Sequence, residues 1–155
     1  MVFEALDEAM ENANEAQDRE FTTIMFDIDF FKHVNDTYGH AGGDAVLISF
    51  AQLLRNEITS PNIVGRIGGE EFLAILYLNE DQALEFCKKL IKKINSNLVN
   101  FDGTDIKISS SGGVAFSSET STSADLTNKA DERLYEAKKS GRNRFQFINS
   151  ELVGD

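Results

Sequence analysis

The sequence predicts an α/β (α+β) fold in which helices pack on one mixed β-sheet. Apolar residues recur three or four positions apart in several segments, which is the period of an amphipathic helix. Short runs rich in β-branched and aromatic residues alternate with these segments and indicate strands. The pair Gly68-Gly69 lies between two such runs and predicts a β-hairpin. The 155 residues fit a single domain, 1–155, with one core.

The first half of the chain is expected to run helix, strand, helix, helix. Phe3–Gln17 has the period of a helix, and Phe21–Ile28 (FTTIMFDI) is rich in residues favoured in strands. A short helix is predicted over Phe30–Asp36, and Gly39 is expected to break it. A longer helix follows the glycines at 42–43. Its apolar face comprises Val46, Leu47, Phe50, Leu53 and Leu54.

The second half is expected to begin with a hairpin formed by Ile63–Ile67 and Phe72–Leu78. Adjacent glycines between these runs tolerate the positive φ values of a tight turn. Asp81–Asn95 is predicted as a helix, and Cys87 lies on its apolar face. Ile106–Phe116 is predicted as a strand.

The closing helix is predicted over Ala124–Lys139, with Thr122 or Ser123 as its N-cap and Gly141 as its C-cap. A last short strand is predicted over Phe145–Ile148. A hairpin that lies between helical crossovers is typical of a ferredoxin-like sheet. The expected architecture is therefore ferredoxin-like, with an additional helix at the N-terminus.

Charge and cysteine content argue against several classes of protein. The formal net charge is −11, from 15 basic and 26 acidic residues, and such a surface repels polyanions. We therefore expect no nucleic-acid partner and no direct contact of this domain with an anionic membrane. Cys87 is the single cysteine, so no intrachain disulfide can form, which is typical of a cytoplasmic protein.

Four carboxylates are expected at exposed positions around the sheet. Asp27 and Asp29 end the first strand, and Glu70 and Glu71 follow the glycines of the hairpin. Two groups of hard oxygen ligands suit Mg²⁺, which takes one or two carboxylates together with substrate phosphates. The same residues also fit helix capping or a solvated surface, so the pattern alone leaves both interpretations open.

Residues at two helix ends also fit two interpretations. Asp29 fits an N-cap of the helix that follows it, with Phe30 and Phe31 in the core, and the first helical turn with Lys32 fits an anion site. Both interpretations can hold together. Lys138 and Arg142 flank the expected end of the closing helix. Cations at this position complement the helix dipole, and they could equally contact a phosphate.

Other polar residues carry little information by themselves. Asn35 and Asp44 are ordinary turn and helix-start residues. His33 and His40 form no zinc-binding pattern, and Cys87 has the character of an inert core residue. The sequence contains no Walker-A loop, no Gly-x-Gly-x-x-Gly motif and no Gly-x-Ser-x-Gly motif.

Four segments together resemble one family. Asp27–His40 (DIDFFKHVNDTYGH) resembles the first signature of the GGDEF family of diguanylate cyclases, and Arg66–Phe72 (RIGGEEF) resembles its name-giving hairpin in the GGEEF variant. Ser111–Ala115 (SGGVA) is similar to a later strand signature, and Ala130–Arg144 (ADERLYEAKKSGRNR) is similar to the closing helix signature. All four occur in the order and spacing of the family.

The resemblance implies a palm-type sheet and a reaction that condenses two GTP molecules into cyclic di-GMP and two pyrophosphates. It implies that Mg²⁺ or Mn²⁺ is bound by Asp27, the carbonyl of Ile28 and Glu70. Glu71 would help to deprotonate the attacking 3′-hydroxyl, and Arg66 would assist charge stabilisation. A metal fits this chemistry because charge develops on the phosphate oxygens.

The resemblance also implies how the substrate is held. Asn35 and Asp44 would read the guanine edge, with Asp44 accepting from its N1–H and amino group. The β- and γ-phosphates would be held by the backbone at the helix start and by cationic side chains. These phosphate contacts would come from Phe30, Phe31, Lys32, Lys138 and Arg142.

Partners follow from the same resemblance. Each subunit of the family binds one GTP, so two hairpins must face each other and turnover needs a homodimer. The parent protein is expected to carry an N-terminal sensory or regulatory domain and could be membrane-anchored.

Two departures from the family pattern matter. The family usually has an Asp-x-Leu-Thr-Gly-Leu-x-Asn-Arg stretch before the point where this chain begins, so we expect a domain truncated at its N-terminus, with weak GTP binding. In place of the family's inhibitory Arg-x-x-Asp, this chain has Thr59 and Asn62. Neither side chain supplies the charge of the residue it replaces, so no tight product inhibition is predicted.

Three hypotheses can be compared. An active cyclase is favoured, because every carboxylate and cation that the mechanism requires is present. A second hypothesis is a catalytically silent GGDEF-type domain that binds GTP or mediates dimerisation. A third is a fragment of another palm-like nucleotidyl cyclase or polymerase. Substitution of Glu70 separates the first two, because it abolishes turnover only in an active enzyme.

Overall fold

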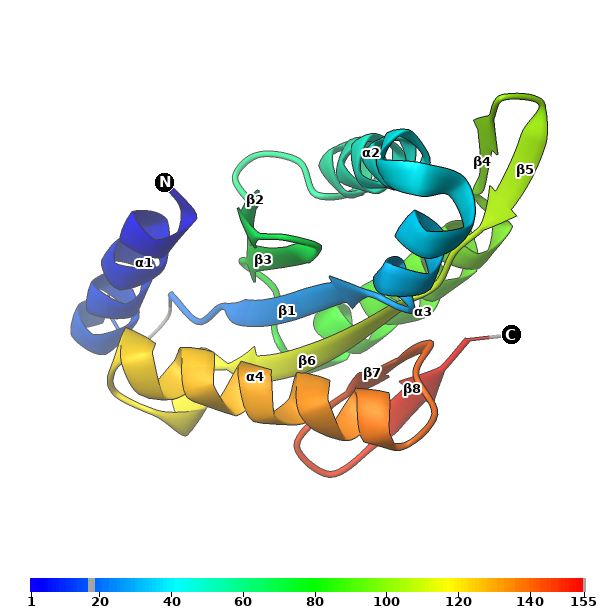
Figure 1. Cartoon of the computed structure of the whole chain (residues 1–155). Coiled ribbons are helices and arrows are strands. Elements are labelled where there is room, and N and C mark those ends of the chain that lie inside the picture. The colour runs from blue at the N-terminus through cyan, green and yellow to red at the C-terminus, as the bar shows by residue number, and fades with distance from the viewer. Residues whose placement is uncertain (17–18, 155) are drawn as a thin grey trace.

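Helices cover both faces of a mixed β-sheet (Figure 1). The computed structural model describes residues 1–16 and 19–154. The helical elements are α1 (Val2–Ala16), α2 (Phe31–Glu57), α3 (Glu80–Ser96), the 3₁₀ turn η1 (Ser117–Glu119) and α4 (Ser123–Lys139). In spatial order, the strands of the main sheet are β2 (Ile63–Gly68), β3 (Glu71–Leu76), β1 (Thr22–Ile28), β6 (Ser110–Phe116), β7 (Arg144–Gln146) and β8 (Glu151–Val153). A separate hairpin consists of β4 (Leu98–Phe101) and β5 (Thr104–Lys107).

Strand β1 lies inside the sheet and pairs antiparallel with both β3 and β6. Strand β7 pairs parallel with β6, and β8 closes that side antiparallel to β7. The path β1-α2-β2-β3-α3-β6 has the β-α-β-β-α-β order of a ferredoxin-like unit. The predicted ferredoxin-like, palm-type fold is therefore confirmed, with α1 added before the unit and α4, β7 and β8 after it.

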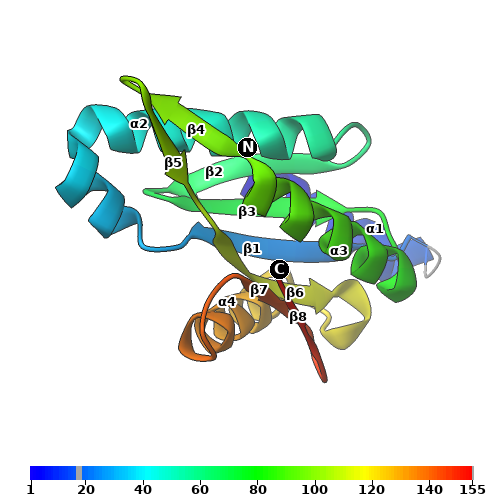
Figure 2. The same cartoon turned by 90° about the vertical axis from the view of Figure 1, so that its right-hand side faces the viewer.

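Two hydrophobic cores lie on opposite faces of the sheet, with α2 and α4 on either side of the strands (Figure 2). In the core under α2 and α3, the ring centroid of Phe26 lies 6.4 Å from that of Phe50 and 5.7 Å from that of Phe145. The ring of Phe50 lies 5.3 Å from that of Phe72. Edge-to-face aromatic pairs of this kind stabilise a core beyond simple burial. Cys87 is buried in the same core, and burial raises the pKa of its thiol.

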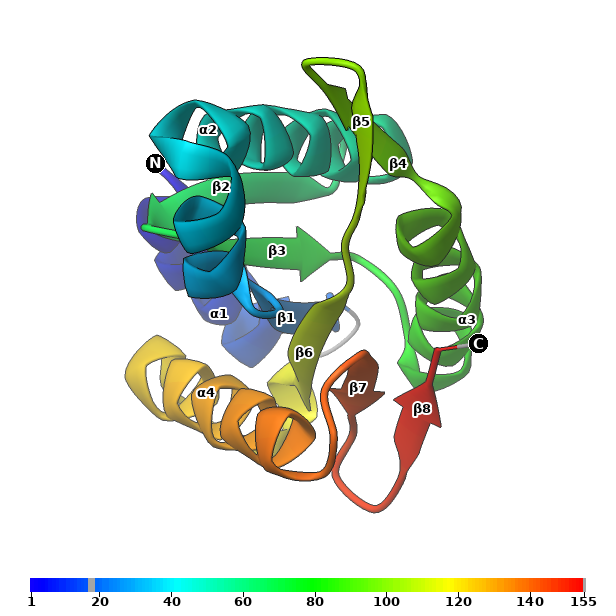
Figure 3. The same cartoon turned by 45° about the vertical axis from the view of Figure 1, so that its right-hand side comes forward.

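Helix α2 is broken at Gly39, as the sequence predicted. Gly39 has φ 76° and ψ 176° inside the helical span, a backbone conformation that glycine adopts without steric cost. The two parts of α2 therefore run in different directions on either side of Gly39. Gly42 packs closely because it has no side chain: a Cβ there would lie 2.4 Å from the Cβ of Tyr38 and 3.5 Å from the ring of Phe101. The β4–β5 hairpin thus lies directly against α2 (Figure 3).

Several predicted boundaries need correction. The strand predicted over Ile106–Phe116 is divided between the end of β5 and β6, and the β4–β5 hairpin and β8 were not predicted. The C-cap of α4 is Ser140, and Gly141 follows it. Thr122 is the N-cap of α4, because its side chain accepts from the backbone of Asp125. The predicted helix end at Gln17 lies outside the described residues.

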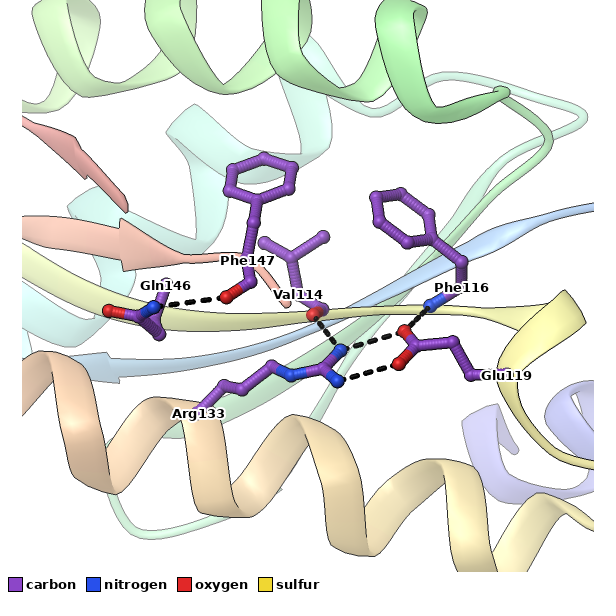
Figure 4. A network of polar contacts seen from close by, with 6 residues as sticks. All are labelled: Val114, Phe116, Glu119, Arg133, Gln146 and Phe147. Atoms are coloured by element: carbon purple, nitrogen blue, oxygen red, sulfur yellow. Dashed lines mark hydrogen bonds and ion pairs between the residues drawn. The ribbon is translucent and has the colours of Figure 1, made fainter. Parts of the chain in front are cut away.

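A nearly buried ion pair joins the middle of α4 to η1 and β6 (Figure 4). The Arg133 guanidinium donates to both carboxylate oxygens of Glu119, at 2.7 and 2.6 Å, and to the carbonyl of Val114 at 2.8 Å. Glu119 also accepts from the backbone N–H of Phe116 at 2.8 Å. Burial acts to raise the pKa of Glu119, but these donors outweigh it and leave the pKa below its usual value.

Candidate active site

Most of the predicted site residues line one cleft, with a volume of about 430 Å³. It lies where β1 ends, α2 begins, the β2–β3 hairpin turns and α4 ends. The predicted residues that line it are Asp27, Ile28, Phe30, Phe31, Lys32, Glu70, Lys138 and Arg142. Asp29, His33 and Asp36 also line the cleft, although none of them was among the predicted site residues.

The sheet register brings the carboxylates together. Asp27 lies directly opposite Glu71 on β3, and directly opposed residues of neighbouring strands point to the same face. The backbone N–H of Ile28 donates to the carbonyl of Glu70 at 3.3 Å, which fixes the hairpin turn against the end of β1. The turn itself uses Gly69, with φ 47°. Three carboxylates therefore meet at one end of the sheet.

Asp27 is paired with a lysine of α4. The expectation of an exposed carboxylate is wrong here, because the strand end is covered: the Asp27 side chain is only 7% exposed and forms an ion pair with the Lys138 ammonium. Burial raises the pKa of Asp27 in spite of this lysine, and the charges of Glu70 and Asp29 act in the same direction. The position next to Asp27 therefore favours a cation, and Lys138 supplies one.

The donor set fits a hard divalent cation that is completed by its substrate. Asp27 and Glu70 offer carboxylate oxygens, and the carbonyl of Ile28 lies between them in the sequence. Over residues 1–16 and 19–154, no group of three or more His, Cys, Asp or Glu side chains forms a complete protein cage for a metal. Mg²⁺ is commonly bound by one or two carboxylates plus substrate phosphates, so these residues suit it.

The start of α2 forms the opposite wall of the cleft. Phe30 is the N-cap, in the left-handed region (φ 54°, ψ 35°), and no side chain caps the helix. The N–H groups of this first turn are thus left for another acceptor, as at an anion site. Arg142 stacks on the Phe30 ring, 4.7 Å from its centroid. Lys32 is mostly exposed and lies 3.5 Å from Asp36.

The interpretation of Asp29 as an N-cap is wrong. Its carboxylate instead accepts hydrogen bonds from the hydroxyls of Ser109 and Ser111 and from the backbone of Asn143. These partners follow Asp29 by 80 or more positions in the chain, so no local pattern indicated them. The run of serines at 109–111 was the available signal, and sequence reasoning did not connect it with Asp29.

Asn35 and Asp44 lie on either side of the break in α2. Asn35 packs on the backbone of Gly43, because a Cβ on Gly43 would lie only 1.8 Å from the Asn35 side-chain oxygen and 3.3 Å from the ring of Phe31. Asp44 is the next residue and is exposed. Neither Asn35 nor Asp44 lines the 430 Å³ cleft. Phe31 lines the cleft, and its ring also lies close to Gly43, which Asn35 contacts.

Arg66 does not line this cleft. Its Nε donates to the carbonyl of Gly69 at 2.8 Å, so it braces the hairpin turn. It also borders a second groove of about 450 Å³ between α2 and β2, together with Leu47 and Phe72. The hydrogen bond from Arg66 to Gly69 therefore stabilises the turn of the β2–β3 hairpin.

Thr59 and Asn62, which replace the inhibitory Arg-x-x-Asp motif, lie in the segment between α2 and β2. The Asn62 side-chain oxygen accepts from the backbone N–H of Tyr77 at 2.8 Å, and the backbone N–H of Asn62 donates to the carbonyl of Thr59. Asn62 thus holds this segment against the end of β3, and Thr59 is exposed. The absence of tight product inhibition stays a prediction.

Comparison with known sequences gives one consistent family. A family model described as "Diguanylate cyclase, GGDEF domain" matches residues 1–144. Diguanylate cyclase A of Treponema denticola is 32% identical over 143 residues, which cover 91% of this chain and 38% of that protein. Diguanylate cyclase DgcS of Shewanella oneidensis is 37% identical over 129 residues, which cover 83% of this chain and 43% of that protein. The chain spans less than half the length of both curated relatives.

Solved structures give the same result. The crystal structure of diguanylate cyclase SiaD in complex with its activator SiaC, from Pseudomonas aeruginosa, matches with a TM-score of 0.90 and 32% identity over 96% of this chain and 57% of that chain. The active GGEEF domain of a diguanylate cyclase from Vibrio cholerae matches with a TM-score of 0.85 and 29% identity, over 96% of this chain and 94% of that chain. No helix of the described residues has the length and apolar character needed to cross a bilayer.

Proposed function

This chain belongs to the GGDEF family of diguanylate cyclases, and from that premise we propose that it condenses two GTP molecules into cyclic di-GMP and two pyrophosphates. The observation that carries the proposal is the meeting of Asp27, Glu70 and Lys138 with the uncapped start of α2 in one cleft. Such a cleft offers oxygen ligands for a cation on one wall and N–H and cationic groups for phosphates on the other.

The metal-binding residues are Asp27, Glu70 and the carbonyl of Ile28, with Mg²⁺ or Mn²⁺ as the ion. A divalent cation bound there would offset the negative charge that develops on the phosphate oxygens. The close contact of Lys138 with Asp27 supports this assignment, since it marks the position where the protein favours a positive charge.

The triphosphate would lie along the start of α2. The free N–H groups after Phe30 and the side chain of Lys32 face this part of the cleft. Arg142 lies beside them, on the Phe30 ring. Once a metal is bound, Lys138 is free to donate to phosphate oxygens. These groups hold the α-phosphate in a fixed orientation for attack by a 3′-hydroxyl.

Glu71 is suited to accept the proton of that 3′-hydroxyl. Its partial burial and the negative charge of Asp27 raise the pKa of its carboxyl. A higher pKa makes a carboxylate a stronger base at neutral pH. The guanine would be read by Asn35 and Asp44, and Arg66 would act by keeping the hairpin turn in shape.

Turnover requires two copies of the domain. One cleft binds one GTP, so the 3′-hydroxyl that attacks must come from the GTP of a second subunit. The hairpins of a homodimer would therefore face each other. An N-terminal sensory or regulatory domain of the parent protein would bring the two copies together, and GTP as substrate places the domain in the cytoplasm.

Product formation by an enforced dimer tests the proposal. The domain is fused to a parallel dimeriser and supplied with GTP and Mg²⁺, and cyclic di-GMP is quantified. Glu71→Gln should reduce the rate by about a hundred-fold or more, as expected for loss of a general base. Glu85→Gln, an exposed carboxylate on α3, is the matched control and should leave the rate unchanged. GTP binding without any product would instead indicate the silent GGDEF-type domain.

A further inference from the structure

We propose that Asp29 is a positioning residue, which holds the Arg142–Asn143 turn and thereby fixes the Arg142 guanidinium at the phosphate end of the cleft. This inference rests on the proposed function, which assigns Arg142 to the phosphates. It gives a role to the second aspartate of the Asp-x-Asp pair, whose side chain makes contacts different from those of Asp27.

The turn after α4 has an unfavourable backbone. Arg142 has φ 65° and Asn143 has φ 51°, so two consecutive residues with side chains are in the left-handed region. This conformation is costly for arginine, is better tolerated by asparagine, and persists where surrounding contacts fix it. The observed turn therefore needs a partner that holds it.

The Asp29 carboxylate provides such a contact. It is almost completely buried, and its Oδ2 accepts from the backbone N–H of Asn143 at 2.9 Å. The same oxygen accepts from the Ser109 hydroxyl at 2.6 Å, and Oδ1 accepts from the Ser111 hydroxyl at 2.6 Å. The backbone N–H of Asp29 donates to the carbonyl of Ser109 at 2.9 Å. The start of β6 and the segment that leads into it thus fix the carboxylate, and the carboxylate fixes the turn.

These contacts also distinguish Asp29 from a metal ligand. Both of its oxygens already accept hydrogen bonds from neutral donors, whereas Asp27 faces the ammonium of Lys138. Charge-assisted hydrogen bonds are stronger than those between neutral groups, so a buried carboxylate is well suited to hold a strained amide in place. The Asp29 carboxylate thus binds a backbone amide and two hydroxyls, whereas the Asp27 carboxylate binds a cation.

The turn carries a side chain that lies in the active-site cleft. The Arg142 guanidinium lies over the Phe30 ring and lines the 430 Å³ cleft. The turn is also connected on its far side, because the carbonyl of Arg142 accepts from Arg144 and its N–H donates to the carbonyl of Ala137. Asp29 is the contact from the β1 side. Losing it should release Arg142 from the cleft while the rest of the fold remains.

A double-mutant cycle on nucleotide affinity tests this role. The probe is a GTP analogue with a methylene bridge between its α- and β-phosphates, bound with Mg²⁺ and measured by calorimetry. Asp29→Ala should weaken binding about ten-fold, the loss expected for one charge-assisted contact. The same change made on top of Arg142→Ala should weaken it less than about two-fold, because the two residues act as one unit.

Two conservative variants serve as controls. Asp29→Asn keeps an oxygen acceptor for the Asn143 amide and should bind the analogue nearly as well as the wild type. Ser111→Ala removes a partner of Oδ1 and leaves the contact of Oδ2 with Asn143, so it should also bind normally. Should Asp29→Ala fail to fold, Asp29→Ser, which is too short to reach Asn143, replaces it in the cycle.

Hydrogen exchange gives a readout that is independent of nucleotide. The Asn143 amide should lose protection in Asp29→Ala, while the amide of Met25 in β1 stays protected. Equal losses of affinity in both backgrounds, or an Asn143 amide that stays protected in Asp29→Ala, would overturn the inference. Failure of the proposed function has a different signature, because the wild type would then bind the analogue and the enforced dimer would form no cyclic di-GMP.

Discussion

Helix α4 carries two cations that each pair with a nearly buried carboxylate, and the two pairs differ in kind. Near the middle of the helix, Arg133 meets Glu119, and the side chains are 13% and 10% exposed. At its last turn, Lys138 meets Asp27, and the side chains are 32% and 7% exposed. Arginine binds its partner through two parallel hydrogen bonds, whereas lysine acts as a point charge.

The pKa values of the two carboxylates shift in opposite directions. Although burial acts to raise it, the pKa of Glu119 is lowered, because Arg133 and the Phe116 N–H together stabilise the charged form. The pKa of Asp27 is raised, because the effect of burial exceeds the effect of its single lysine. Both oxygens of Glu119 have donors, so this pair needs no further cation. Asp27 is incompletely neutralised and favours a stronger cation, which fits its proposed role as a metal ligand.

The largest expected effect comes from removing the carboxylate that pairs with Lys138. Asp27→Asn should lower cyclic di-GMP formation about a thousand-fold, since it removes a proposed ligand of the metal. Its unfolding midpoint should stay close to that of the wild type, because the lost pair was incompletely satisfied. Rates and thermal unfolding measured on the same preparations check this. A large loss of stability with activity retained would contradict the comparison.

The reverse pattern is expected at the Arg133–Glu119 pair. Glu119→Gln should lower the free energy of unfolding by about 3 kcal/mol, because it leaves the buried Arg133 guanidinium without its counter-charge. The rate of the folded enforced dimer should remain within about two-fold of the wild type, since neither residue lines the cleft. Urea unfolding and initial rates provide the two measurements. The exposed pair Lys88–Glu85 is the control, and Glu85→Gln should change stability by less than about 0.5 kcal/mol.

A smaller effect is expected when the lysine is removed. Lys138→Met should tighten Mg²⁺ binding to the nucleotide-free domain by about ten-fold, or about 1.4 kcal/mol, because the metal no longer displaces an ammonium from Asp27. Calorimetric titration with Mg²⁺ measures this. Arg133→Met should leave Mg²⁺ affinity unchanged. Weaker binding by Lys138→Met would mean that the lysine and the metal do not share one position.

The smallest effect is a dependence of stability on pH at the Arg133–Glu119 pair. A lowered folded-state pKa contributes stability that is present above the usual glutamate value of 4.5 and is lost as pH falls through the folded value. The stability difference between wild type and Glu119→Gln should therefore be constant near neutral pH and shrink as the pH falls below 4.5. Urea unfolding at a series of pH values tests the sign. A difference that grows on acidification would refute it.

The main elements of the fold could be predicted because each has a local pattern. The breaks at Gly39 and Gly69 follow from backbone freedom, and the long helices follow from their apolar period. The β4–β5 hairpin was missed although Asp102-Gly103 is a strong turn signal. Its strands have four residues each, too short for a clear alternation. Strand β8 was missed for the same reason, with three residues.

The candidate site could be predicted only in part. Resemblance gave the identity of the residues in the cleft, but local patterns could not show that Asp29 would bond to Asn143 or that Lys138 would pair with Asp27. Both contacts join segments more than a hundred positions apart, so they depend on the finished sheet. The bracing role of Arg66 was likewise hidden, because a sequence motif does not show hydrogen bonds.

The single buried thiol of the core makes this domain convenient for spectroscopy. Burial and a raised pKa leave Cys87 unreactive at neutral pH, so a cysteine introduced on the surface would be the one that takes up a label. Ile48 of α2, 59% exposed beside the groove that Arg66 borders, is a suitable position. Spin labels on Ile48→Cys in two associated copies would give the distance between their α2 helices directly, without first removing a native cysteine.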